Sequence, residues 1–146
     1  MDPSVGGEGV DYALLNIDSG LRIAAHVRLA GDSAARRRGL LGIDKLDREA
    51  GLWIVPCEAI HTFGMQMPID VLFLDRDLKV RKLLAGMRPR RISLCLVASS
   101  VVEIRSGAIA QSNTRVGHRL AIRRARQDYS MEAKEPMSCG PTCPSS

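Results

Sequence analysis

The fold is decided by the stretch VLFLDRDLKVRKLLAGMRP, residues 71–89. Its first four residues are apolar without interruption, which is typical of a strand that is covered on both faces. Arg76 and Asp77 can then form a tight turn that returns the chain into a second strand. We therefore expect a hairpin whose first strand is central in the sheet.

Strand patterns continue on the N-terminal side of this hairpin. Residues 21–29 alternate, with Leu21, Ile23, Ala25, Val27 and Leu29 on one face, which predicts a strand with one buried face. His26 then falls on the solvent face. Asp18-Ser19-Gly20 predicts the hairpin turn before this strand. Residues 48–57, REAGLWIVPC, predict a strand closed by Pro56, with Trp53 anchoring the core.

Two short helices and two more strands complete the pattern. In residues 31–46, Asp32 or Ser33 can cap a helix that Gly39 or Gly42 can end. SVVEIRSG (100–107) and HRLAIRRA (118–125) predict strands, with a helical turn between them. Many short strands joined by tight turns predict a mainly β fold, either a β-sandwich or a jelly-roll-like barrel with two short helices.

We expect one domain, because 146 residues suffice for one core and not for two. Residues 10–126 form this domain in our prediction. Residues 1–9 are Gly-rich and polar, and 127–146 are rich in Pro, Gly and Ser, so we expect a disordered N-terminus and a flexible tail that includes Cys139 and Cys143.

Composition narrows the function classes. Hydrophobic residues make up 45% of the chain and charged residues 25%, as in globular proteins. No apolar run approaches the roughly 20 residues that span a bilayer, and the N-terminal residues lack a signal-peptide pattern. We expect a cytoplasmic monomer.

The net charge of +5 raises the possibility of a polyanion partner. Arginines cluster at 36–38, at 88, 90 and 91, and at 123, 124 and 126. Aromatic residues make up only 3% of the chain, which leaves little surface for bases to stack on and argues against nucleic-acid binding. Polyanion binding through the arginine clusters stays a second alternative function.

The order of several short motifs resembles a known family. RRGLLG (37–42) precedes IHTFGMQMPIDVLFLD (60–75), a strand ending in MRP, then VVEIRSG (101–107) and a helix opening at Gly107. Over residues 12–123 this order resembles the bacterial and archaeal family of domain of unknown function 192. The resemblance implies a compact sandwich or jelly-roll fold. It transfers no catalytic residue, because the family has no established activity.

Two departures from the family pattern matter. Many members begin with a signal peptide or a lipoprotein start, which this sequence does not show. Many also have Gly-Asp where this chain has Gly117-His118, so an acidic role at that position is lost here.

His61, Asp70 and Glu103 are the candidate catalytic residues. His61 could act as a base or ligand that Asp70 or Glu103 orients. A structural interpretation explains the same residues: His61 as a bonded imidazole, Asp70 as an acceptor for loop amides, and Glu103 as a partner of Arg38. Candidate ligand-binding residues are His61, Phe63, Met65, Met67 and Arg38, with the methionines as an adaptable apolar lining.

No motif in the sequence indicates a metal or a cofactor, and we expect neither. Cys57 and Cys95 read as small core residues in a reducing compartment, and as a possible disulfide if the protein is exported. The main hypothesis is a non-enzymatic module that binds a protein or small ligand. The first alternative is an enzyme or metal-dependent catalyst centred on His61 and Asp70.

Overall fold

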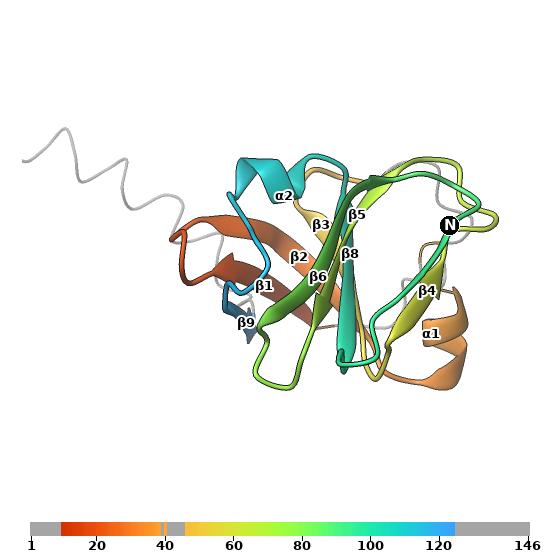
Figure 1. The fold of residues 1–146 in the computed structure, drawn as a ribbon, viewed down its shortest axis with the longest axis horizontal. Coiled ribbons are helices and arrows are strands. Elements are labelled where there is room, and N and C mark those ends of the chain that lie inside the picture. The colour runs from red at the N-terminus through yellow and green to blue at the C-terminus, as the bar shows by residue number, and fades with distance from the viewer. Residues whose placement is uncertain (1–9, 39, 41–45, 125–146) are drawn as a thin grey trace, which may run out of the picture.

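The computed structural model describes residues 10–38, 40 and 46–124. Within these residues the chain forms nine strands and two short helices (Figure 1): β1 (Asp11–Asn16), β2 (Arg22–Ala30), α1 (Ser33–Arg38), β3 (Ala50–Ile54), β4 (Ala59–His61), β5 (Ile69–Leu74), β6 (Val80–Met87), β7 (Ile92–Leu94), β8 (Ser100–Arg105), α2 (Ala108–Gln111) and β9 (Leu120–Arg124). The prediction of a mainly β fold with two short helices is confirmed.

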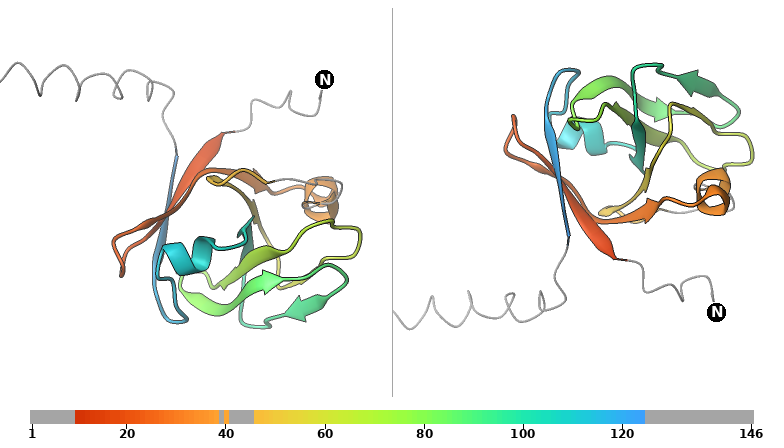
Figure 2. Two further views of the ribbon diagram at one scale, coloured as in Figure 1. Left: turned by 90° about the horizontal axis from the view of Figure 1, so that it is seen from above. Right: turned by 90° about the horizontal axis from the view of Figure 1, so that it is seen from below.

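Seven strands form one sheet in the order β6-β5-β8-β3-β2-β1-β9. All neighbours are antiparallel except β2 and β3, which are parallel. The sheet curls on itself into a half-barrel (Figures 1 and 2). A separate two-stranded sheet, β4 and β7, lies at the end of the molecule where α1 is found.

Strand β5 is buried along its whole length, as its uninterrupted apolar sequence predicts. Its alternating side chains enter two different clusters, because successive residues of a strand point to opposite faces. Leu72 and Leu74 join one cluster with α2 and β9. Val71 and Phe73 join the other, which includes Ile60 of β4. The two faces of this strand therefore serve two packing environments.

The predicted turns have formed where expected. Residues 17–21 join β1 to β2, and residues 75–79 join β5 to β6. Asp32 caps α1, because its carboxylate accepts a hydrogen bond from the Ala35 N–H at 2.8 Å. Gly39 and Gly42, the predicted helix ends, lie outside the described residues.

Two expectations need correction. The strict alternation expected for β2 is wrong, because the β1–β2 pairing shifts register next to Leu14, which pairs with Ala24. Ala24 is consequently buried, while Leu21 and Leu29 are 41% and 45% exposed. Trp53 is only partly buried, and it packs edge-on against Tyr12 at the border of a cluster. Phe73 is instead the largest of the fully buried side chains.

None of the helices in the described ranges has the length and apolarity to span a membrane. The predicted disordered segment 1–9 and the tail 127–146 fall outside the described residues, so these boundaries stay predictions.

Candidate functional site

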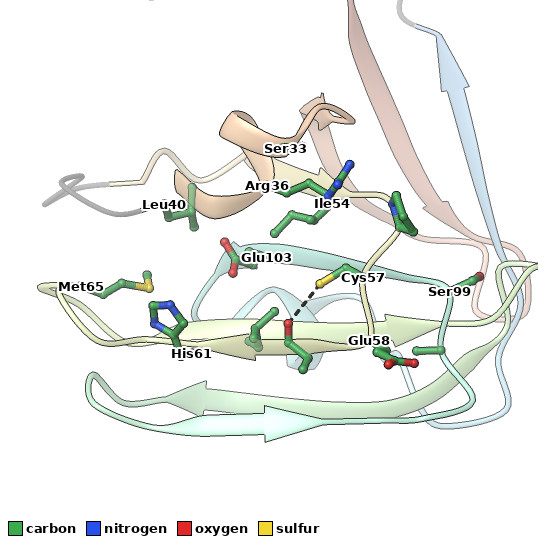
Figure 3. A pocket seen from close by; sticks show the side chains of 14 residues that line it. Ser33, Arg36, Leu40, Ile54, Cys57, Glu58, His61, Met65, Ser99 and Glu103 are labelled. Atoms are coloured by element: carbon green, nitrogen blue, oxygen red, sulfur yellow. Dashed lines mark hydrogen bonds between the residues drawn. The ribbon is translucent and has the colours of Figure 1, made fainter.

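A groove of about 780 Å³ opens between α1 and β4 (Figure 3). One wall comes from Ser33 and Arg36 of α1, and the opposite wall from Ala59 and His61 of β4. The remaining lining residues are mostly apolar, and they come from β3 and the loop after it, from β4 and the loop after it, from the segment before β8, and from one position after α1: Ile54, Pro56, Cys57, Glu58, Ile60, Met65, Ala98, Ser99 and Leu40. Glu103 of β8 lies at its inner end.

Glu103 is the most unusual residue of the groove. It lies between apolar neighbours on β8, Val102 and Ile104, and it is 3% exposed. Its Oε2 atom is buried and has no hydrogen-bond partner among the described residues. Burial raises the pKa of this carboxyl from 4.5 to about 7. A buried carboxyl without a partner is costly to the fold, which makes it a candidate for binding something else.

Asp70 does not reach this groove. On β5 it pairs with Ile104, whereas Val71 is the residue opposite Glu103. Successive side chains alternate across a sheet, so Asp70 and Glu103 point to opposite faces. The predicted constellation of His61, Asp70 and Glu103 therefore brings together only His61 and Glu103.

Asp70 links the end of β6 to the start of α2 instead. Its carboxylate accepts hydrogen bonds from the backbone N–H groups of Gly86 at 2.8 Å, Gly107 at 3.1 Å and Ile109 at 2.9 Å. Gly86 and Gly107 have φ values of 66° and 103°, which glycine adopts without strain. Asp70 thus accepts backbone amides, as the structural interpretation expected, but these amides belong to β6 and the start of α2 and not to the loop beside Pro68.

The other predicted ligand-binding residues are divided between several environments. His61 and Met65 line the groove, where Met65 is 6% exposed. Phe63 is 47% exposed, and its ring lies 5.7 Å from that of His61. Met67 lines a second hollow beside Arg105. Arg38 ends α1, but its side chain lies outside the described part of the chain, so its predicted pairing with Glu103 stays a prediction.

Cys57, which was predicted to be a small core residue or half of a disulfide, lines the groove. Its Sγ donates a hydrogen bond to the Ala59 carbonyl at 3.2 Å, and burial raises the pKa of this thiol above its usual value. The thiol is therefore held in its protonated, less nucleophilic form. Cys95 is also a free thiol, and both cysteines pack against the hydrophobic cluster that contains Phe73 and Ile60. A disulfide on export stays a prediction.

Arg36, Ser33 and Ile54 were not identified as site residues. Ser33 and Arg36 belong to α1 and Ile54 ends β3, and only the tertiary structure places these elements around the same groove as Glu103. Glu103 itself had a signal, since a carboxylate inside an apolar strand needs a partner.

The polar groups of the groove lie within a mostly apolar lining. Within the described ranges, no three His, Cys, Asp or Glu side chains converge to hold a metal ion. His61 accepts a hydrogen bond from the Phe63 N–H through Nδ1. A largely apolar groove with a few polar groups is the usual form of a ligand site.

Comparisons with known proteins agree with this fold. The family profile of DUF192, described as an uncharacterised group, matches residues 15–122. A protein of unknown function from Novosphingobium aromaticivorans has a similar structure, with a TM-score of 0.69, 22% identity, and coverage of 83% of this chain and 90% of that one.

A second structure, of a Sinorhizobium meliloti protein proposed as a transcription regulator, has a TM-score of 0.66 and 22% identity, covering 77% of this chain and 92% of that one. At this identity the likeness shows the fold alone. No curated protein matches the chain.

Proposed function

The chain belongs to the DUF192 family, and we propose that it is a non-enzymatic ligand-binding domain whose site is the groove between α1 and β4. The observation that supports this most strongly is Glu103. Its carboxyl faces a groove of about 780 Å³, and one of its oxygens has no partner among the described residues. A ligand that donates a hydrogen bond or carries a positive charge would satisfy it.

The lining supports a ligand with an apolar body. Ile54, Ile60, Met65 and Ala98 present hydrocarbon to the groove, and burying apolar ligand surface contributes about 25 cal/mol per Å². The polar groups are few and lie at fixed places, which is how ligand sites obtain orientation and specificity.

Hexylamine and hexanol test this proposal as a matched pair of probes. Both have the same apolar chain, and only hexylamine offers a cation to Glu103. We expect NMR signals of groove residues to shift with both probes, and hexylamine to bind at least tenfold more tightly at pH 8.

Ser33→Trp should obstruct the mouth of the groove, because Ser33 lines it and is exposed. Arg76→Trp places the same side chain on an exposed turn outside the groove and serves as the control. Loss of hexylamine binding in Ser33→Trp alone supports the proposal. Equal binding by both variants, or no binding by the unmodified protein, contradicts it.

An enzyme centred on His61 and Asp70 receives no support from the geometry, because the Asp70 carboxylate is bonded to three amides on the other face of the sheet. Polyanion binding stays an alternative. Arg88, Arg90 and Arg91 are exposed on the β6–β7 loop, and retention on heparin that weakens with salt would favour it.

A further inference from the structure

Strand β4 has one edge paired and one edge open. In an antiparallel pair, alternate residues direct their N–H and C=O groups toward the partner strand, and the residues between them direct these groups away. The Thr62 N–H donates to Arg91 O at 2.8 Å, and the Cys95 N–H donates to Glu58 O at 2.8 Å. The backbone groups of residues 58 and 62 therefore point toward β7. Ile60 lies between them and pairs with Ser93, so its backbone groups point the same way.

Ala59 and His61 consequently direct their backbone groups away from β7. The Cys57 thiol confirms this direction for Ala59, because it donates to the Ala59 carbonyl on the groove side (Figure 3). Ala59 and His61 also line the groove. The Ala59 N–H and the N–H and C=O groups of His61 have no backbone partner among the described residues. The groove wall thus includes an unpaired strand edge, a known template for adding another strand.

We propose that the groove binds an extended peptide segment, which pairs with the outer edge of β4 and inserts a lysine or arginine side chain toward Glu103. This inference rests on the proposed ligand-binding function and names the class of ligand. The open edge favours a peptide over other apolar cations, because a peptide alone repeats donors and acceptors at the spacing of a strand.

The direction of the side chains fits this arrangement. Ile60 points into the cluster that also contains Val101, and Val101 shares the face of β8 with Glu103. In an added strand, alternate side chains would lie on the same side as Ile60 and so point to the interior where Glu103 lies. The intervening side chains would lie with Ala59 and His61 on the exposed side.

The charges of the described side chains favour a basic residue. Glu103 and Glu58 line the groove, and Arg36 on α1 is the cation that faces them. Arg36 is engaged with its own helix start, since its guanidinium donates to the Gly31 carbonyl. His61 and Cys57 complete the titratable groups of the lining. A lysine or arginine side chain would supply the counter-charge that Glu103 lacks.

A five-residue probe, acetyl-Thr-Val-Lys-Val-Thr-amide, tests the proposal by calorimetry and amide hydrogen exchange. We expect binding to slow exchange of the Ala59 and His61 amides at least tenfold. Replacing the probe's lysine by norleucine should weaken binding at least tenfold in the unmodified protein and less than threefold in Glu103→Gln. This difference isolates the charge contact from the apolar contact.

Backbone pairing is tested by N-methylation of the probe. Two probes are needed, each methylated at one of the two alternate sets of backbone nitrogens. One should lose binding and the other should bind within threefold of the unmethylated probe, because only one set of N–H groups would face β4. Equal effects in both phases, or unchanged exchange at Ala59 and His61, would overturn strand addition.

The probes separate this inference from the function it rests on. Binding of hexylamine without binding of the peptide would refute the peptide and leave the ligand-binding groove standing. Failure of hexylamine, hexanol and peptide alike would refute both.

Discussion

Asp70 and Glu103 are two buried carboxylates on neighbouring strands, and they occupy opposite situations. Asp70 is 1% exposed and accepts three backbone hydrogen bonds. Glu103 is 3% exposed, and its Oε2 has no partner among the described residues. On one face of the sheet, the Asp70 carboxylate satisfies backbone N–H groups. On the opposite face, the Glu103 carboxyl lines the groove.

The difference indicates that burial alone does not assign a role to an acidic residue. A carboxylate whose lone pairs are used by the backbone stabilises the loops around it. A carboxyl that is desolvated without such bonds weakens the fold, and it becomes useful when a ligand arrives. The comparison therefore predicts opposite consequences for the same kind of substitution at the two positions.

The largest effect should come from Asp70→Ala. The change leaves the N–H groups of Gly86, Gly107 and Ile109 without their acceptor in a buried site. We expect a loss of about 3–5 kcal/mol in the free energy of unfolding, measured by urea denaturation. Asp70→Asn keeps one carbonyl acceptor and should lose less. A loss below 1 kcal/mol for Asp70→Ala would contradict the bonding role.

Glu103→Gln should change the pH dependence of stability. The folded protein holds the Glu103 proton between pH 4.5 and about 7, while the unfolded chain releases it near 4.5. The contribution of this group is complete below pH 4.5 and is lost as the pH rises to 7, by about 3 kcal/mol. Urea denaturation across this range should show the unmodified protein losing about that much stability relative to Glu103→Gln.

The control for this experiment is a comparison of both proteins at pH 4, where Glu103 is protonated. At this pH, any advantage of Glu103→Gln over the unmodified protein in the free energy of unfolding should be at its smallest. A difference that is independent of pH would show that Glu103 does not titrate in the window. A variant that is much less stable at pH 8 would instead support the predicted pairing of Glu103 with Arg38.

Gly51→Ala should have an intermediate effect. Gly51 lies on β3 opposite Ile104, and an added Cβ would approach the Ile104 side chain to 2.8 Å and the Glu103 carbonyl to 3.0 Å. We expect a loss of about 1–3 kcal/mol from overpacking, read from thermal and urea unfolding. Gly31→Ala is the matched control, because its added Cβ would meet only Leu29, at 4.0 Å.

The smallest effect should come from His26→Ala. The His26 Nδ1 atom lies 3.1 Å from the Asp11 Oδ2 atom, and both side chains are exposed. Exposed pairs contribute little because water screens them, so the change should stay within about 1 kcal/mol. A larger loss in urea denaturation would show that the β1–β2 pairing depends on this contact.

Much of the fold could be predicted from periodicity and turn residues. The apolar run of β5, the turn after Asp75 and the cap at Asp32 are local features, and the structure confirms them. The register shift beside Leu14 could not be predicted, because it depends on how two strands meet. The same is true of the parallel pairing of β2 with β3.

The site was less accessible to sequence reasoning. The enzyme hypothesis took His61 and Asp70 from the single stretch 60–75 and expected Asp70 or Glu103 to orient His61. The chain turns between β4 and β5, however, and only the register of β5 with β8 shows that Asp70 faces away from Glu103. Arg36 and Cys57 join the groove through tertiary packing, which no local pattern indicates.

The most direct test of the account is the titration of the Glu103 side-chain carboxyl by carbon-detected NMR, alone and with saturating hexylamine. The account predicts a pKa of about 7 for the protein alone, and a clearly lower pKa with the amine, because a bound cation stabilises the carboxylate. A pKa near 4.5 that the amine does not change would contradict the claim that Glu103 is an unpartnered carboxyl facing a ligand site.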